Sequence, residues 1–220
     1  DTRTLARGLR ELPPQESRLD LRGDWQFAAG RLPDPKAPGW RDAATARVPG
    51  HVAFDGLIPD HGIATLRRTI AIPADWRVDA FLARFDGAYG QAERGGNGEA
   101  AGTHSAGATS FDVDLTPFLA PGENTLTIVL TEYTPHAVLD YMAWYAHTSL
   151  LGIWREAVLF RVPNVHLGPT TLRAGWDVDQ RAGTLEFASE IVNLETSLHS
   201  YTLELSVSDA GRLLHRTTLS

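Results

Sequence analysis

Apolar and polar residues alternate along several short segments of the chain, which is the pattern of β-strands with one buried face. Three sets of side chains are expected to point inward: Leu66, Ile70 and Ile72; Phe81, Ala83 and Phe85; and Phe111, Val113 and Leu115. The residues between them, such as Arg84, Asp112 and Asp114, are expected to face outward. No segment longer than a few residues has a helical period of 3.6 residues. The chain is therefore predicted to fold as an all-β sandwich or barrel.

Turn-forming residues separate the expected strands. Asn97-Gly98 predicts a tight hairpin turn, because both residues tolerate a positive φ. Residues 116–124 predict a short helical turn, with Thr116 as its cap and Pro117 in its first position. Residues 28–40 are rich in Pro, Gly and Ala and have no periodicity, which predicts a loop.

The pattern divides the chain into three parts. Residues 1–18 are expected to form an N-terminal tail, with one weak helical turn that the double proline ends. That turn would use Leu5, Leu9 and Leu12. Residues 19–165 predict one all-β domain.

Residues 166–220 predict three or four strands of a second all-β unit. The length of this segment is roughly half of that of an immunoglobulin-like sandwich. Half a sandwich leaves unpaired strand edges and an uncovered apolar face. We therefore expect a truncated unit, or one that completes itself against a second copy of the chain. The alternative is a stable small sandwich.

Composition excludes several classes of function. The 220 residues are 43% hydrophobic, enough for a core, and carry a net charge of −7 without a Lys- or Arg-rich run. Nucleic-acid and anionic-membrane partners are therefore not expected. The absence of cysteine excludes disulfides and thiol nucleophiles. No apolar stretch reaches the roughly 18 to 20 residues of a membrane helix.

The first residues leave the compartment open. The chain starts at Asp1 without an initiator Met or an apolar signal segment. We expect that an upstream part was removed or that the chain starts inside a longer gene. Cytoplasmic and secreted locations both fit.

Five segments occur in an order that resembles a known family. They are Val48–His51, Thr65–Trp76, Phe85–Leu119, Pro121–Leu130 and Leu150–Phe160. Together they resemble the N-terminal sugar-binding domain of glycoside hydrolase family 2, the β-galactosidases, β-glucuronidases and β-mannosidases. The resemblance implies a jelly-roll (galactose-binding-like) β-sandwich, then an immunoglobulin-like domain, here truncated, and then a catalytic (β/α)₈ barrel. The barrel is not among these residues.

The chain departs from the family pattern in three places. Leu66 stands where the family usually has Tyr, and Leu151 where it usually has Gly. The family usually runs an apolar strand into the Asn-Gly turn, whereas this chain has Glu93, Arg94, Gly95 and Gly96. Because adjacent glycines weaken a strand, we expect this hairpin to be loose or bulged.

The resemblance implies that the catalytic residues lie elsewhere. A retaining glycosidase uses two carboxyl groups, and the family carries both on the barrel, the acid/base glutamate following an asparagine. The four asparagines here precede Gly, Thr, Val and Leu. We therefore expect no catalytic residue in the chain and no hydrolysis by it alone.

The resemblance also implies that a loop before Gly152 contributes to sugar binding. Asp140 is the best match to the family's acidic residue that reaches sugar hydroxyls, because a carboxylate accepts two charge-assisted hydrogen bonds. Tyr141, Trp144 and Tyr145 could stack on a pyranose ring. The alternative is that these aromatic side chains fill the gap between domains.

A second loop, after Gly50, matches a region where family members form a subsite. Asp60 and His61 are its candidate sugar-binding residues. The alternative is a solvated turn before Gly62.

No cofactor or metal is expected, because no His-x-His or His-x-x-x-His spacing occurs. Asp112 and Asp114 could bind calcium, but a solvated strand face is the simpler interpretation.

The sequence favours the N-terminal, non-catalytic part of a family 2 glycoside hydrolase that cleaves terminal β-linked sugars. Its partners would be a β-glycoside carbohydrate and the absent catalytic barrel. The alternative is a free-standing carbohydrate-binding module without hydrolase activity. A third hypothesis is a structural adhesion module. The sequence does not identify the sugar.

Overall fold

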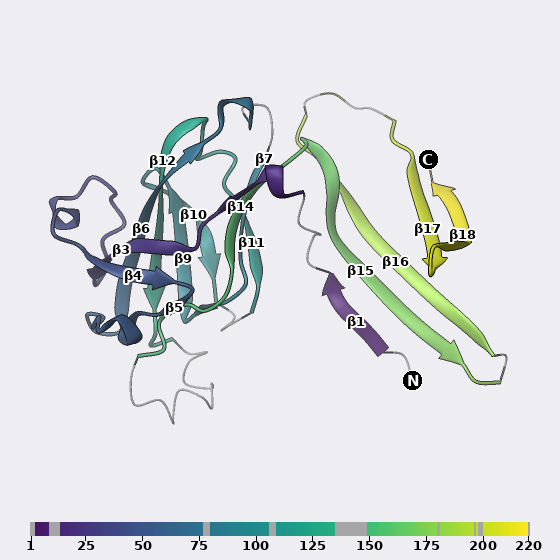
Figure 1. Ribbon diagram of the computed structural model, residues 1–220, viewed down its shortest axis with the longest axis horizontal. Helices are drawn as coiled ribbons and strands as arrows, with labels where there is room; N and C mark the ends of the chain where they lie inside the picture. The colour runs from purple at the N-terminus through teal and green to yellow at the C-terminus, as the bar shows by residue number, and fades with distance from the viewer. Residues whose placement is uncertain are drawn as a thin grey trace.

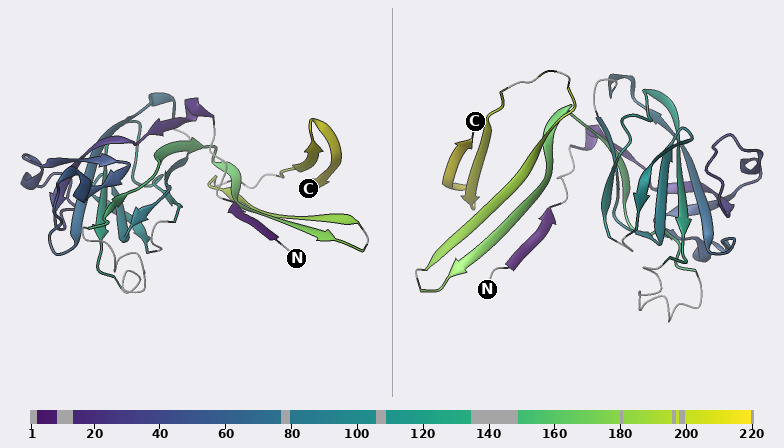
Figure 2. Two further views of the ribbon diagram at one scale, coloured as in Figure 1. Left: turned by 60° about the horizontal axis from the view of Figure 1, so that its bottom comes forward. Right: turned by 180° about the vertical axis from the view of Figure 1, so that it is seen from behind.

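The computed structural model describes residues 3–8, 14–76, 80–105, 109–134, 149–179, 181–195, 197 and 200–219 (Figures 1 and 2). Its regular elements in these ranges are β-strands and short 3₁₀ helices, namely η1 (Gln15–Ser17), η2 (Pro38–Trp40), η3 (Val52–Asp55) and η4 (Ala74–Trp76). The all-β fold expected from the sequence is confirmed. Within the same ranges, no helix has the length and apolar character needed to cross a membrane.

Two antiparallel sheets pack face to face as a β-sandwich. One has the strand order β10-β9-β12-β6-β3-β4 and the other β11-β7-β14-β2, while a small sheet, β5-β13-β8, lies beside them. The strands are β2 (Arg18–Asp20), β3 (Gly23–Ala29), β4 (Ala44–Val48), β5 (Gly50–His51), β6 (Ile63–Ile72), β7 (Ala80–Phe85), β8 (Ala88–Tyr89), β9 (Gln91–Gly96), β10 (Glu99–His104), β11 (Phe111–Asp114), β12 (Gly122–Thr131), β13 (Gly152–Ile153) and β14 (Ala157–Val162).

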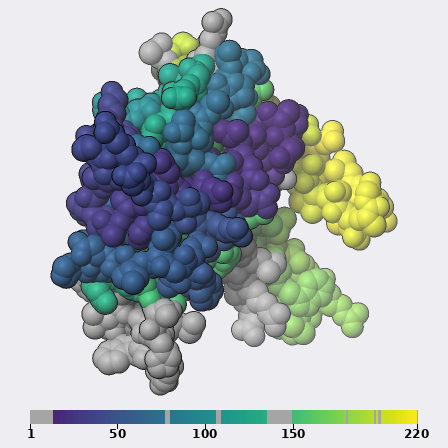
Figure 3. Space-filling model, turned by 60° about the vertical axis from the view of Figure 1, so that its left-hand side comes forward, coloured from purple at the N-terminus to yellow at the C-terminus, as the bar shows by residue number. Residues whose placement is uncertain are grey.

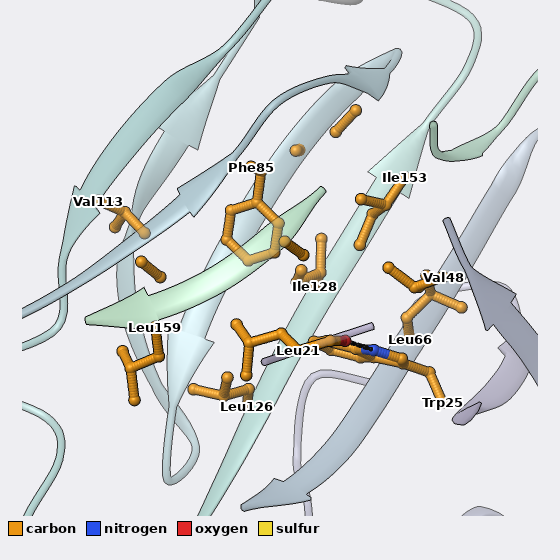
Figure 4. Close-up of a cluster of buried hydrophobic side chains, with 14 of the residues drawn as sticks. Leu21, Trp25, Val48, Leu66, Phe85, Val113, Leu126, Ile128, Ile153 and Leu159 are labelled. Carbon is orange, nitrogen blue, oxygen red and sulfur yellow. Dashed lines mark hydrogen bonds between the residues drawn. The ribbon is translucent and has the colours of Figure 1, made fainter. Parts of the chain in front are cut away.

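Side chains from both sheets meet in one hydrophobic core (Figure 4). All three sets of residues expected to point inward belong to this core. Trp25 is 1% exposed and donates its indole N–H to the carbonyl oxygen of Leu21 at 2.8 Å. Because each large apolar side chain contributes about 1.5–3 kcal/mol when buried, this core is the main source of stability of the sandwich.

The opposite face of β7 and β14 is also buried, so Arg84 does not face solvent, whereas Asp114 on β11 is exposed as expected. Its apolar cluster consists of Ala80, Leu82, Val158, Phe160 and Val162. Arg84, 5% exposed, forms a two-pronged ion pair with Asp112 on β11. The Nε–Oδ1 distance is 2.7 Å and the Nη2–Oδ2 distance is 2.9 Å. Asp112, itself partly exposed, thus neutralises a buried cation.

The expected loop between β3 and β4 folds over the outer face of the six-stranded sheet. The Thr65 hydroxyl donates to the carbonyl of Gly30 at 2.7 Å and accepts from the backbone N–H of Leu32 at 2.9 Å. Trp40 is buried, and the Arg67 guanidinium lies 4.6 Å from its ring centroid. The segment covers the sheet on the face shown in Figure 3, in purple to dark blue.

The β9–β10 hairpin explains the run of glycines. Its Asn97-Gly98 turn has φ angles of 52° and 94°, as the sequence predicts. A Cβ on Gly96 would lie 2.9 Å from the Cβ of Phe118, so the strand needs glycine there. The pairing shifts register between Ala100 and Gly102, which confirms the expected bulge.

The expected turn after β11 forms, but Thr116 does not cap it. Its hydroxyl accepts a hydrogen bond from the backbone N–H of Phe81 at 3.0 Å, which ties the turn to β7. The turn itself is closed by the N–H of Phe118, which donates to the carbonyl of Leu115 at 3.0 Å. The capping prediction is wrong because a distant strand competes for the hydroxyl.

The remaining strands form two further sheets beside the sandwich (Figures 1 and 2). They are β1 (Arg3–Gly8), β15 (Val165–Asp177), β16 (Ala182–Asn193), β17 (Leu203–Asp209) and β18 (Arg212–Leu219), in the orders β1-β15-β16 and β17-β18. Four strands follow the sandwich, within the three or four that were expected. Leu5 lies in β1, paired with β15, rather than in the expected helical turn.

One face of the β15–β16 pair is apolar and lies open. Leu172 pairs opposite Phe187, and Ala174 opposite Leu185. On the same face, Trp176 is 60% exposed. An open apolar surface of this kind is typical of a site that contacts a partner.

In the small sheet, two glycines allow the backbones of β5 and β13 to meet. Gly152 pairs with His51 and has a φ of 155°. A Cβ on Gly152 would clash with the carbonyl oxygen of Gly50. This end of the sandwich therefore depends on the absence of a side chain at residue 152.

Removing the carboxylate of Asp112 should destabilise the sandwich, because it leaves the Arg84 charge buried without its partner. We expect Asp112→Ala to lower the free energy of unfolding by about 2–4 kcal/mol in urea titrations followed by tryptophan fluorescence. Asp24→Ala, at an exposed strand position, is the control and should change it by less than about 0.5 kcal/mol. Equal effects of the two substitutions would contradict this role of the ion pair.

Gly152→Ala should force β5 and β13 apart and cost about 1–3 kcal/mol more than a substitution that only adds a side chain at positive φ. Gly56→Ala supplies that comparison, since Gly56 has a φ of 73° and nothing within 4 Å of an added Cβ. Thermal unfolding measures both variants. A melting temperature of Gly152→Ala at or above that of Gly56→Ala would show that the close approach does not matter.

Candidate functional site

Two segments that the sequence singles out come together at one end of the sandwich. The first, residues 50–63, contains β5 and η3; the second includes residues 131–134 and 149–154. The backbone N–H of Val52 donates to the carbonyl of Leu151 at 2.9 Å. We call the surface formed by these residues the loop end; β5 marks it in Figure 1.

A second contact joins the same segments beside Asp60 and His61. The N–H of Glu132 donates to the carbonyl of Gly62 at 2.8 Å. The Glu132 carboxylate in turn accepts the N–H of Leu150 at 2.9 Å. Because Gly62 has no side chain, Tyr133 packs against it: an added Cβ would lie 2.5 Å from two carbons of the tyrosine ring.

Asp60 and His61 are brought to the loop end by a tight turn. Asp60 and Ile63 form an isolated antiparallel bridge, and His61 and Gly62 between them have φ angles of 48° and 71°. The Asp60 carboxylate lies 2.7 Å from Nδ1 of His61. Both side chains are exposed, so their remaining hydrogen-bonding atoms can reach hydroxyl groups of a ligand.

Four rings stack in a row from the surface to the core at the loop end. Phe54 stacks on His51 with 4.6 Å between centroids, and His51 stacks on Trp154 at 4.7 Å. Trp154 then stacks on buried Tyr89 at 5.0 Å. Burial lowers the pKa of His51, which favours the neutral form of the imidazole between the two rings. The stack holds an exposed aromatic ring in a fixed orientation.

The loop end also carries exposed apolar residues that were not predicted from the sequence. Phe54 is 80% exposed, Ile58 81% and Tyr133 76%, and they are the exposed large hydrophobic residues within the described part of the sandwich. Single aromatic residues in polar loops give a weak signal, because exposure depends on how the loops fold. Their gathering at one end indicates a surface that contacts a ligand or a partner.

Four of the sequence-predicted residues lie outside the described residues: Asp140, Tyr141, Trp144 and Tyr145. The described residues that flank their segment, Thr134 and Ser149, both belong to the loop end. The chain therefore leaves and re-enters the described structure beside Asp60 and His61. No catalytic residue was expected, and none is assigned.

Comparison with known proteins finds similar sequences as well as similar solved structures. No family model matches the chain. It is 27% identical to the β-galactosidase BoGH2A of Bacteroides ovatus over 94% of the chain and 25% of that protein. The chain thus spans about a quarter of this curated relative.

Solved structures give the same fold. A β-glucuronidase from an uncultured Clostridium species matches with a TM-score of 0.73 and 17% identity, over 96% of this chain and 39% of that one. A glycosyl hydrolase family 2 member from Bacteroides cellulosilyticus matches with a TM-score of 0.59 and 14% identity, over 92% and 36%. The resemblance of this chain to glycoside hydrolase family 2, expected from its five ordered segments, is confirmed.

Proposed function

We propose that the chain is the N-terminal, non-catalytic region of a glycoside hydrolase that cleaves terminal β-linked sugars. The observation that carries this proposal is the unequal coverage of the match with BoGH2A, which takes in 94% of this chain but only 25% of that β-galactosidase. A region that accounts for a quarter of an enzyme leaves room for the catalytic domain elsewhere. The hydrolytic carboxyl groups would belong to that domain, with a retaining mechanism.

Several carboxylates of the chain already have structural partners. Asp112 is paired with Arg84, and Glu93 with Arg31. Asp20 accepts hydrogen bonds from Arg22. Ion-paired carboxylates are held in place by their arginines, which favours a supporting role for this region over hydrolysis.

The loop end is the part proposed to wall the sugar pocket. The Asp60 carboxylate can accept hydroxyl hydrogen bonds, and the flat Tyr133 ring can pack against the C–H face of a pyranose. Asp140, Tyr141, Trp144 and Tyr145 would add to this wall from the segment between Thr134 and Ser149. Sugar binding by all of these residues is part of the proposal.

The open apolar strands suggest the scaffolding role. In the proposed organisation, residues 19–165 are the jelly-roll domain and residues 166–220 are part of an immunoglobulin-like domain. The pairing of β1 with β15 brings part of the expected tail, residues 1–18, to this second domain. The rest of the parent enzyme would cover the apolar face around Trp176 and position the catalytic barrel beside the loop end.

The proposal is tested by comparing the 220-residue chain with the polypeptide encoded by the complete reading frame. We expect hydrolysis of an aryl β-galactoside or aryl β-glucuronide by the longer polypeptide and none by the chain alone. Hydrolysis by the chain itself would contradict the proposal. A reading frame that ends at Ser220, together with binding of β-linked sugars by the chain, would support the free-standing binding module instead.

Tyr133→Ala in the active polypeptide should raise KM by about 2- to 10-fold, because it removes a stacking surface worth about 0.5–1.5 kcal/mol. Steady-state kinetics on a β-linked disaccharide measures this. Glu123→Ala is the control, since Glu123 is exposed near the start of β12 and Tyr133 follows its end. An unchanged KM for Tyr133→Ala would remove this ring from the proposed wall.

A further inference from the structure

Residues 93–96 are the clearest departure from the family pattern. They place a charged side chain, Arg94, on the inward face of β9 at the edge of the sandwich. Glu93 lies on the outer face of β9 and pairs with Arg31. Arg94 points the other way, on the same face as Ala92, which is fully buried in the core. An arginine thus occupies an inward position of a strand that is usually apolar in the family.

The Arg94 guanidinium is partly buried and poorly satisfied. Its Cζ lies 4.9 Å from the ring centroid of Phe111 on the facing sheet. Its Nε lies 3.4 Å from the carbonyl oxygen of Gly102, at the long limit for a hydrogen bond. Gly102 makes room for it, because an added Cβ would lie 3.2 Å from Nη2.

Arg94 differs from the paired arginines of the chain in its electrostatic surroundings. Other arginines form ion pairs, among them Arg22, Arg31 and Arg84. In the described part of the chain, no carboxylate lies within ion-pair distance of Arg94. Burial lowers its pKa, and no acidic group acts against that effect. A partly desolvated cation without a counter-charge is a site that an anion would stabilise.

His104 stands next to this cation. It pairs opposite Ala92 and so shares the inward face with Arg94. Its ring stacks on Phe111 with 3.9 Å between centroids, and its Nε2 lies 3.3 Å from the Thr109 hydroxyl. Burial, and then the charge of Arg94, lower the pKa of His104.

We propose that Arg94, His104 and Thr109, the sandwich-edge cluster, form a binding site for a carboxylate group. The planar guanidinium has parallel N–H donors that match the two oxygens of a carboxylate. The imidazole of His104 beside it, and the Thr109 hydroxyl that contacts this imidazole, supply further polar contacts, and Phe111 forms the apolar base of the site. The cluster lies on β9, β10 and the approach to β11, on elements other than those of the loop end, so it does not depend on the proposed function.

The pKa of His104 reports on this site in NMR titrations of the 220-residue chain. Its signal is identified by its loss in His104→Gln. Sodium acetate should raise the pKa of His104 toward the ordinary histidine value, because the bound negative charge offsets the effect of Arg94. Sodium chloride at equal ionic strength is the reference. Equal responses to acetate and chloride, or none to acetate, would overturn the proposal.

Variants distinguish acetate binding at this site from a general effect of salt on the pKa of His104. Arg94→Leu should raise the pKa of His104 without acetate and abolish the acetate response. Arg31→Leu removes an arginine from the outer face and should leave that response intact. If Arg94→Leu does not fold, Arg94→Lys takes its place. It keeps the positive charge but loses the parallel N–H donors of the guanidinium, and should weaken acetate binding several-fold. An undiminished response in a folded Arg94 variant would contradict the proposal.

Two further arms define the ligand. Glucuronate should act like acetate while glucose has no effect, and an equal effect of glucose would overturn the carboxylate chemistry. In the longer polypeptide, a His104 that responds to acetate indicates a free carboxylate as ligand. A pKa of His104 already raised there, and insensitive to acetate, indicates a carboxylate side chain from the rest of the protein. A lowered pKa that ignores acetate would contradict both sources.

Discussion

The pairing of β12 with β6 is the constraint on which the rest of the sandwich depends. All ten residues of β12, Gly122–Thr131, pair with β6 without a register shift, and β12 also pairs with β9. This register turns Leu126, Ile128 and Leu130 into the core, and a slip by one residue would turn all three away from it. It also fixes where β12 ends, and therefore where Glu132 and Tyr133 meet the turn at Gly62.

The pairing of β12 with β6 positions the segments of the loop end, and these segments pack closely against each other. Glycines at residues 62 and 152 allow Tyr133 and Gly50 to come near, and the ring stack from Phe54 to Tyr89 connects the surface to the core. The loop end thus combines exposed polar and aromatic side chains on a rigid base. At the edge of the same sandwich, Arg94 instead places a cation where the core would otherwise continue.

The alternation of residues predicted the inward faces of β6, β7 and β11, because burial of one face has a period of two in the sequence. It could not predict that Arg84 and Asp112 neutralise each other on a second buried face, since that depends on which strands become neighbours. The same limit applies to Thr116, whose hydroxyl is taken by Phe81, and to Leu5, which joins a strand begun more than 150 residues later. The hairpin at Asn97-Gly98 was predictable because its conformation is local. The exposure of Phe54 and Tyr133 was not, because it results from the meeting of two distant loops.

We propose that the loop end of this sandwich faces the sugar in the complete enzyme. A crystal structure of the complete polypeptide with a bound β-glycoside analogue tests it most directly. The account predicts the sugar within contact distance of the surface around Asp60 and Tyr133. A sugar bound by a catalytic domain that touches the sandwich at another face would contradict it.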